Sequence, residues 1–231
     1  MGENIPILLV PGLACSARLF TAQAAALWPR GPVTVASHLE GTSVAETARR
    51  ILDSAPPRFA IAGLSLGGYL TFEIWRQAPE RVLRLALLDT SARPDAPEAG
   101  KVRQERIALT ESGKFRKVME DQFAIAVHAD NQEAIREDFF AMADETGPRA
   151  YVIHQRAIMA RPDSRPTLET ITCPALVIVG EDDKLTPPEH AREMADGIQG
   201  AKLVSIPRCG HMATMEKPAE VNAALLAWLD A

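Results

Sequence analysis

The sequence has few cysteines and lacks both long apolar runs and long basic runs. Its three cysteines, Cys15, Cys173 and Cys209, are scattered, so their spacing indicates neither a disulfide framework nor a metal site. No stretch approaches the roughly 20 apolar residues that cross a bilayer, and the first residues lack the basic region of a signal peptide. No run of Lys or Arg offers a track for phosphates. We therefore expect a cytoplasmic protein with no nucleic-acid or membrane partner.

Six short apolar runs alternate with longer helix-like segments. The 231 residues, 47% of them hydrophobic, suffice for one domain with a substantial core. The runs are rich in Leu and β-branched residues without strict polar alternation, which indicates strands buried on both faces of a parallel sheet. We therefore predict a doubly wound α/β fold with a mostly parallel sheet of about six strands, which binds ligands at the carboxyl ends of the strands. The predicted strands are Ile5–Val10, Val33–Ser37, Phe59–Gly63, Val82–Asp89, Ala175–Gly180 and Lys202–Ile206, and the predicted helices are Ser16–Trp28, Ser43–Ser54, Gly67–Gln77, Pro188–Ile198 and Pro218–Leu229.

The segment from Arg93 to Leu168 interrupts this alternation, because it contains amphipathic helical patterns and no convincing strand. Further helices packed on the sheet are one interpretation. We favour a helical cap over the carboxyl edge of the sheet. Helices that pack on the sheet usually connect one strand to the next, and this segment contains no strands for its helices to connect. The predicted organisation is a core of residues 1–92 and 169–231, with a helical cap inserted at 93–168.

The most informative motif is Gly63-Leu64-Ser65-Leu66-Gly67, which follows an apolar run and precedes a helix-like segment. Glycines on either side of a serine allow a tight, strained turn from which the hydroxyl projects. The N-terminus of the helix then directs N–H groups at developing negative charge. Ser65 is therefore the candidate nucleophile. The alternative is a glycine-rich turn with a structural serine.

A serine nucleophile needs an imidazole as its base. Of the five histidines, His211 lies on the loop after the last predicted strand, at the same sheet edge as Ser65. We therefore predict that His211 is the general base. The remaining histidines are expected to be structural or exposed, and among them His154 alone is expected near the pocket.

The imidazole needs a carboxylate partner for its second nitrogen. Asp182 and Asp183 follow the predicted strand Ala175–Gly180, and Asp89 ends another strand, so all three lie at the carboxyl edge. Spacing alone does not choose among these three carboxylates.

A tetrahedral intermediate needs two donors for its oxygen. The N–H of Leu66, which follows Ser65 directly, is one candidate, and the N–H of Leu13 is the other. Leu13 lies in the loop after the first predicted strand, where Gly12 lets the chain turn. Because these donors are backbone N–H groups, the side chains at positions 13 and 66 say little about whether the two groups can bind an oxyanion.

With these residues the chain resembles the α/β-hydrolase superfamily over Ile5–Leu229. It is similar to the small capped serine esterases of that superfamily, a group that includes enol-lactone hydrolases and the methyl ester esterase of biotin synthesis. The family places its acid at the fourth position of a G-x-x-D-x-x-x-P stretch, which favours Asp183. The chain order of serine, aspartate and histidine also agrees with that of the family. The motifs that carry the resemblance are Gly63–Gly67, Gly180-x-x-Asp183-x-x-x-Pro187, and Gly210-His211 followed by Glu216-Lys217-Pro218.

Two features depart from the family pattern. Pro11-Gly12 stands where the family usually has His-Gly, so a structural histidine is missing from that loop. The chain also starts at what would be the family's third strand, so no leading antiparallel hairpin is expected.

The residues and the resemblance together imply a serine hydrolase that acts on small-molecule carboxylic esters through an acyl-enzyme, with no metal or organic cofactor. The alternatives are a small-molecule receptor that keeps the triad, and a C–C bond hydrolase or acyltransferase that uses it. The predicted cap also supplies side chains for apolar pocket walls that favour small or medium acyl groups, although core packing explains the pattern equally well. These side chains are Phe115, Phe123, Phe139 and Tyr151, with His154 nearby.

Overall fold

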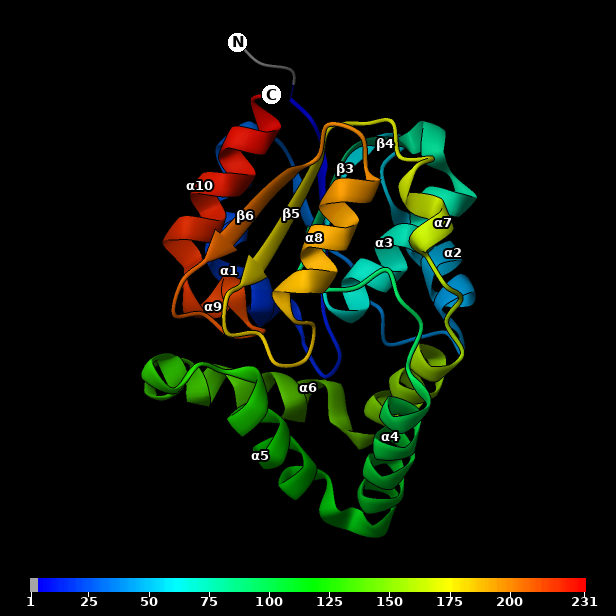
Figure 1. Cartoon of the computed structure of the whole chain (residues 1–231), viewed down its shortest axis with the longest axis vertical. Coiled ribbons are helices and arrows are strands. Elements are labelled where there is room, and N and C mark those ends of the chain that lie inside the picture. The colour runs from blue at the N-terminus through cyan, green and yellow to red at the C-terminus, as the bar shows by residue number, and fades with distance from the viewer. Residues whose placement is uncertain (1–3) are drawn as a thin grey trace.

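The computed structural model describes residues 4–231, in which six parallel strands form one sheet. In chain order the strands are β1 (Ile7–Val10), β2 (Val33–Val35), β3 (Phe59–Leu64), β4 (Val82–Leu88), β5 (Ala175–Gly180) and β6 (Lys202–Ile206). Their spatial order is β2-β1-β3-β4-β5-β6 (Figure 1). The chain moves outward from β1 to β2 and then returns to the other side of β1. The direction of winding therefore reverses between β1 and β3, which is where doubly wound sheets bind ligands.

Helices cover both faces of the sheet (Figure 1). One face carries α1 (Thr21–Leu27) and α10 (Pro218–Leu229), and the other carries α2 (Val44–Ser54), α3 (Leu66–Gln77) and α8 (Pro188–Gly197). Successive strand residues point to opposite faces, so Leu8 and Leu9 of β1 belong to two separate apolar clusters. Burial on both faces explains why the inner strands β1, β3 and β5 are continuously apolar in sequence.

Between β4 and β5 the described chain is helical and contains no strand. Its helices are α4 (Pro97–Leu109), α5 (Phe115–Ala126), α6 (Gln132–Met159) and α7 (Arg165–Leu168). A π-turn over Thr110–Lys114 joins α4 to α5, and α6 is kinked at Gly147, whose φ is 75°, and Pro148. Helices α4, α5 and α6 lie beyond the carboxyl ends of the strands (Figure 1).

The predicted fold class is confirmed, with small changes at the ends of elements. Strand β1 begins at Ile7 rather than Ile5, and the helix predicted over Ser16–Trp28 is divided into a 3-10 turn and α1. At the start of α2, Ser43 Oγ accepts from the N–H of Glu46 at 3.1 Å and caps the helix. None of the helices in residues 4–231 has the length and apolar character to span a bilayer. The remaining short elements are α9 (Ala213–Glu216) and 3-10 turns at Ala17–Phe20, Trp28–Arg30, Pro79–Arg81 and Ala129–Asn131.

Candidate active site

Ser65 lies in a strained turn between β3 and α3. Its backbone has φ 57° and ψ −115°, which residues other than glycine rarely adopt. Neighbouring backbone leaves no room for side chains on either side of it: a Cβ at Gly63 would lie 2.2 Å from Gly67 O, and a Cβ at Gly67 would lie 1.9 Å from Val10 O. The Ser65 N–H donates to Leu88 O at 3.0 Å and ties the turn to the end of β4. The serine is thus held at the apex of the turn.

The imidazole of His211 and the carboxylate of Asp183 form a buried pair. His211 Nδ1 lies 2.8 Å from Asp183 Oδ2, and the two residues are 4% and 3% exposed. Asp183 also accepts from the N–H groups of Leu185 at 2.8 Å and Thr186 at 3.0 Å, and from Thr186 Oγ1 at 2.7 Å. These bonds fix the carboxylate, and they leave His211 Nε2 as the ring nitrogen that can accept a proton.

Burial and charge act in opposite directions on this pair. Burial raises the pKa of Asp183, but the charge and hydrogen bond of His211 outweigh it, so the pKa lies below its ordinary value. Burial lowers the pKa of His211, but the charge and hydrogen bond of Asp183, with the charge of Asp89, leave this pKa above its ordinary value. The arrangement therefore favours an imidazolium beside a carboxylate, the ion pair that forms when a histidine acts as a base.

In residues 4–231 the other two candidate acids form no hydrogen bond or salt bridge with this imidazole. Asp89 is fully buried and accepts from the N–H groups of Gly180 at 3.0 Å and Ala213 at 3.1 Å. Burial, together with the charge of Asp183, raises the pKa of Asp89 well above its ordinary value. Asp182 is exposed. Of the three carboxylates left open by spacing, Asp183 is the one at hydrogen-bond distance from the ring.

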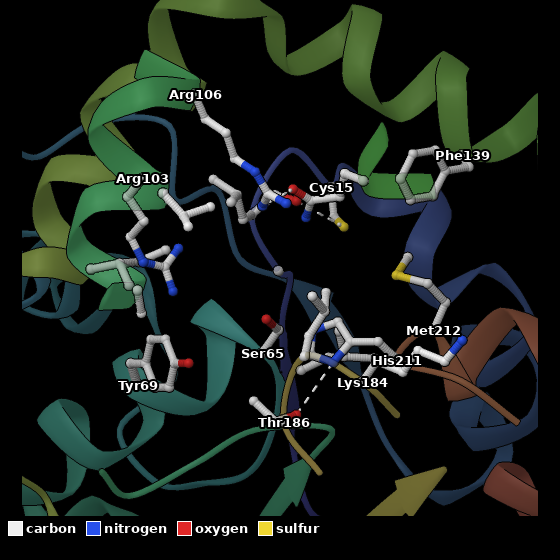
Figure 2. Close-up of a pocket in the computed structure, with 18 residues that line it drawn as sticks. Cys15, Ser65, Tyr69, Arg103, Arg106, Phe139, Lys184, Thr186, His211 and Met212 are labelled. Atoms are coloured by element: carbon white, nitrogen blue, oxygen red, sulfur yellow. Dashed lines mark hydrogen bonds between the residues drawn. The ribbon is translucent and has the colours of Figure 1, made fainter. Parts of the chain in front are cut away.

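Ser65 and His211 line the same cavity, which has a volume of about 240 Å³ (Figure 2). Ser65 points into the cavity from the end of β3, and His211 lies beside it (Figure 2). In residues 4–231, His211 Nδ1 lies at hydrogen-bond distance from both Asp183 Oδ2 and Thr186 Oγ1, and no hydrogen bond joins the ring to Ser65. The structure thus brings Ser65, His211 and Asp183 to one edge of the sheet. The hydrogen bond between the serine hydroxyl and the imidazole is not formed.

The two amides predicted as oxyanion donors have no acceptor in the part of the chain that the structure describes. Leu13 lines the cavity, and Leu66 begins α3 directly after the serine. The loop before Leu13 is held by His38, whose Nε2 lies 2.9 Å from Gly12 O. Burial lowers the pKa of His38 to about 3, so its ring is neutral near pH 7. His38, which the sequence left as structural or exposed, thus braces the loop in which the family's structural histidine is missing.

Of the five side chains predicted near the pocket, Phe139 lines the cavity and the other four do not. Phe123 packs edge-on against Phe139, with ring centroids 5.0 Å apart. Tyr151 is fully buried, and Phe115 packs edge-on against it with ring centroids 5.4 Å apart. The ring of His154 stacks on that of His38 at 4.6 Å between centroids. Core packing, the alternative account of these positions, describes these four side chains.

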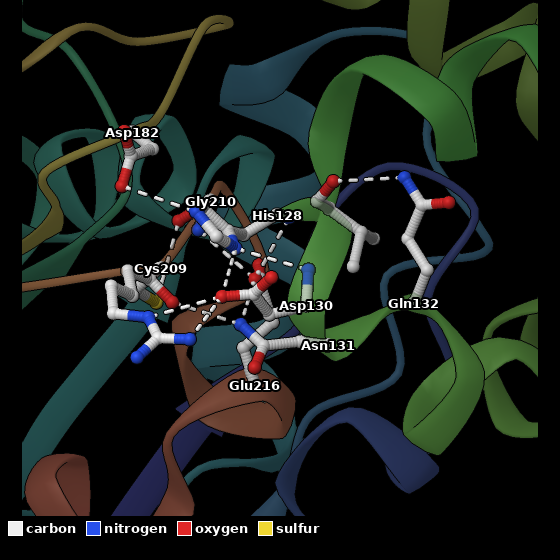
Figure 3. Close-up of polar contacts among 10 residues, drawn as sticks. His128, Asp130, Asn131, Gln132, Asp182, Cys209, Gly210 and Glu216 are labelled. Atoms are coloured by element: carbon white, nitrogen blue, oxygen red, sulfur yellow. Dashed lines mark hydrogen bonds and ion pairs between the residues drawn. The ribbon is translucent and has the colours of Figure 1, made fainter.

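Glu216 fixes the loop that carries the imidazole (Figure 3). Its carboxylate accepts from the N–H groups of Gly210 at 3.0 Å and Met212 at 3.1 Å, which flank His211 on both sides. It also accepts from Asn131 Nδ2 at 2.8 Å, and this contact joins the loop to the helical segment. In sequence Glu216 stood out only as part of a family motif, without a role.

The cavity also has cationic walls that sequence reasoning missed. Arg103, Arg106 and Lys184 line it, and Arg103 and Arg106 belong to α4, a helix without a clear apolar stripe (Figure 2). Within residues 4–231 no group of three or more His, Cys, Asp or Glu side chains has the placement to hold a metal ion.

Comparisons with known proteins agree with this architecture. The model of the alpha/beta hydrolase family matches residues 7–224. RutD of Variovorax paradoxus, whose name assigns it to carbamate hydrolysis, is 29% identical, covering 96% of this chain and 91% of the relative. A pimeloyl-[acyl-carrier protein] methyl ester esterase of Nitrosospira multiformis is 25% identical, covering 75% of this chain and 69% of the relative. The structure of an esterase from Thermogutta terrifontis has a TM-score of 0.88 and 27% identity, covering 100% of this chain and 91% of that one.

Proposed function

Since the chain belongs to the alpha/beta hydrolase family and is a hydrolase, we propose that it cleaves carboxylic esters with Ser65, His211 and Asp183 as a catalytic triad. The observation that carries the proposal is the meeting of a strained serine with a buried histidine–carboxylate pair in one cavity. The esterases among the similar proteins support the choice of esters.

In the proposed mechanism, His211 Nε2 takes the proton of Ser65 Oγ while the oxygen attacks the ester carbonyl carbon. The carbonyl oxygen becomes an oxyanion, which accepts hydrogen bonds from the N–H groups of Leu13 and Leu66. When this intermediate collapses, the C–O bond to the alcohol breaks, and His211 gives its proton to the leaving oxygen. A water molecule, deprotonated by the same imidazole, then hydrolyses the acyl-enzyme and regenerates Ser65.

We also propose that the helical segment 93–168 serves as a cap on this site. Side chains of α4, α5 and α6 line the cavity opposite the sheet, among them Arg106, Gln122 and Phe139. A segment in that position limits which acyl and alcohol groups fit and shields the reacting carbonyl from water.

The decisive test is Ser65→Ala against wild type on 4-nitrophenyl butyrate. We expect the wild type to release a burst of 4-nitrophenol before its steady state, and the variant to lose about 10³-fold or more in kcat. Ser205→Ala, at an exposed position on β6, is the matched control and should keep full activity. Retained turnover in Ser65→Ala would refute the triad. A thermal shift with the ester but no turnover in the wild type would favour a receptor.

Carbamates are the second candidate substrates, because of the similarity to RutD. The same serine can attack a carbamate carbonyl, so the ratio of kcat/KM for matched 4-nitrophenyl esters and carbamates decides between the two classes. A ratio below one would replace esters by carbamates in the proposal.

A further inference from the structure

The charge of the cavity is opposite to the charge of the whole chain. The sequence has a formal net charge of −5, with 30 acidic and 25 basic residues. The described residues that line the cavity nevertheless include three cations, Arg103, Arg106 and Lys184, and no Asp or Glu. A concave site lined by one sign of charge concentrates ligands of the opposite sign.

Arg103 is already engaged, but its surroundings keep a net positive charge. Its guanidinium pairs with Asp95 at 2.6 Å and donates to Gln155 Oε1 at 2.7 Å. The same Asp95 also pairs with Arg161 at 2.6 Å, so one carboxylate is shared by two guanidinium groups. Arg161 in turn lies over the ring of Tyr69, another residue of the cavity wall, at 4.2 Å.

In residues 4–231, Arg106 and Lys184 form no salt bridge with a carboxylate, and of these two cavity cations Lys184 is exposed whereas Arg106 is partly buried. Arg106 donates to the neutral amide oxygen of Gln122 at 3.2 Å and lies near the neutral hydroxyl of Tyr151, so neither neighbour offsets its charge. The side chain is partly buried and extends from α4 into the cavity, across from Ser65 (Figure 2). A guanidinium carries five N–H donors in a planar fork that fits a carboxylate, so most of its donors are unused here. A ligand that enters the cavity can therefore supply the carboxylate that this partly buried cation lacks in residues 4–231.

We propose that the substrate carries a carboxylate, away from the carbonyl that is attacked, and that Arg106 binds it. This inference rests on the proposed ester hydrolysis by Ser65. Arg106 is a specificity residue in this scheme: it takes no part in proton transfer and selects anionic over neutral esters.

The test compares charged and neutral esters in two matched pairs. The first pair places the charge on the acyl side: mono(4-nitrophenyl) adipate against 4-nitrophenyl hexanoate. The second places it on the alcohol side: 3-carboxy-4-nitrophenyl butyrate against 4-nitrophenyl butyrate. The variants are Arg106→Gln, Arg106→Lys, which keeps the charge, and Lys101→Gln as the control, which removes an exposed cation from the same helix.

In at least one pair we expect the wild type to prefer the charged ester. Arg106→Gln should lower the ratio of kcat/KM for the charged ester to kcat/KM for the neutral ester by about tenfold or more. A loss of this size is expected for one ion pair in a partly buried site. Arg106→Lys should restore part of the ratio, and Lys101→Gln should leave it as in the wild type. Ester turnover without any change of either ratio in Arg106→Gln would overturn the inference and leave the proposed function standing.

Failure of the proposed function gives a different result. If the wild type hydrolyses none of the four esters, titration calorimetry with monomethyl adipate still measures the anion site. Binding by the wild type that is weakened tenfold in Arg106→Gln supports the inference without hydrolysis, and equal binding by both overturns it. Circular dichroism of each variant verifies that it is folded.

Discussion

At the scale of single residues, the protonation of His211 decides when the proposed site can work. The ring must be neutral to accept the proton of Ser65, and Asp183 favours its charged form. Burial lowers the pKa of His211, and the charge and hydrogen bond of Asp183 more than reverse that effect, so the pKa lies above the ordinary value of 6.5. As pH falls through this raised pKa, the base becomes protonated and activity is lost.

We therefore expect kcat/KM for 4-nitrophenyl butyrate to rise with pH and to level off above an apparent pKa higher than 6.5. Asp183→Asn removes the charge that raises this pKa, so its remaining activity should persist to lower pH. Its kcat should fall by about 10³- to 10⁴-fold, because the ring loses its orientation and its counter-charge. A pH–rate profile of both proteins measures the two effects. An unchanged acid limb in Asp183→Asn would contradict the pairing.

The sequence predicts a site residue well only where the residues next to it in the chain form a recognisable pattern. The turn at Ser65 was predictable because Gly63 and Gly67 each lie two residues from Ser65 in sequence. Both must be glycine, since a Cβ at either position would collide with backbone. The choice of Asp183 over Asp89 was not predictable from spacing, because both end strands and only the course of the loops decides which meets the ring. For His38 the sequence left a structural and an exposed position open, because its partner, Gly12, is distant in sequence and offers only a backbone oxygen.

At the scale of elements, the junction of β3 and α3 depends on the close approach of backbones. A Cβ at Gly67 would lie 1.9 Å from Val10 O, and backbone cannot move aside as a flexible side chain can. Gly100, in α4, offers the contrast, because nothing lies within 4 Å of a Cβ placed there.

Gly67→Ala should therefore lower the free energy of unfolding by about 2 kcal/mol or more, or prevent folding altogether. Gly100→Ala makes the same chemical change in an open helical position and should raise the free energy of unfolding by about 0.5–1 kcal/mol. Urea denaturation of both variants and the wild type measures the difference. Equal stabilities of the two variants would show that the close approach at Gly67 has no cost.

The family resemblance inferred from the motifs is confirmed. Helices and strands were predictable where an apolar sequence pattern coincides with burial. All six strands were predictable: burial on both faces leaves β1, β3 and β5 entirely apolar, and the edge strands β2 and β6 keep Leu and β-branched residues. Helix α4 was not predictable, because Ile107 is its one buried residue and the side chains that face the cavity include Arg103 and Arg106. A helix that presents charges to a ligand site has no apolar stripe to detect.

At the scale of the whole molecule, the helical segment 93–168 is fastened to the sheet at several points. Phe123 and Phe139 share one apolar cluster with residues of β1 and β3. The N–H of His211 donates to Ala126 O at 2.7 Å, and Arg18 pairs with Asp138 at 3.1 Å and Glu145 at 2.6 Å. The exposed ion pairs contribute little, about 0–1 kcal/mol each, so the shared apolar cluster holds the segment in place.

This shared cluster implies that the segment 93–168 and the sheet unfold together. The three tryptophans, Trp28, Trp75 and Trp228, all lie outside the segment, so their fluorescence reports on the rest of the chain. Circular dichroism at 222 nm includes the long helices α4, α5 and α6 as well. In urea we expect both signals to change with one midpoint and one slope, as for a two-state transition. Trp28→Phe removes the tryptophan that is 70% exposed and should leave the midpoint unchanged. A dichroism change that precedes the fluorescence change would instead mark the segment as a unit that unfolds first, because its helices would be lost while Trp75 and Trp228 stay buried.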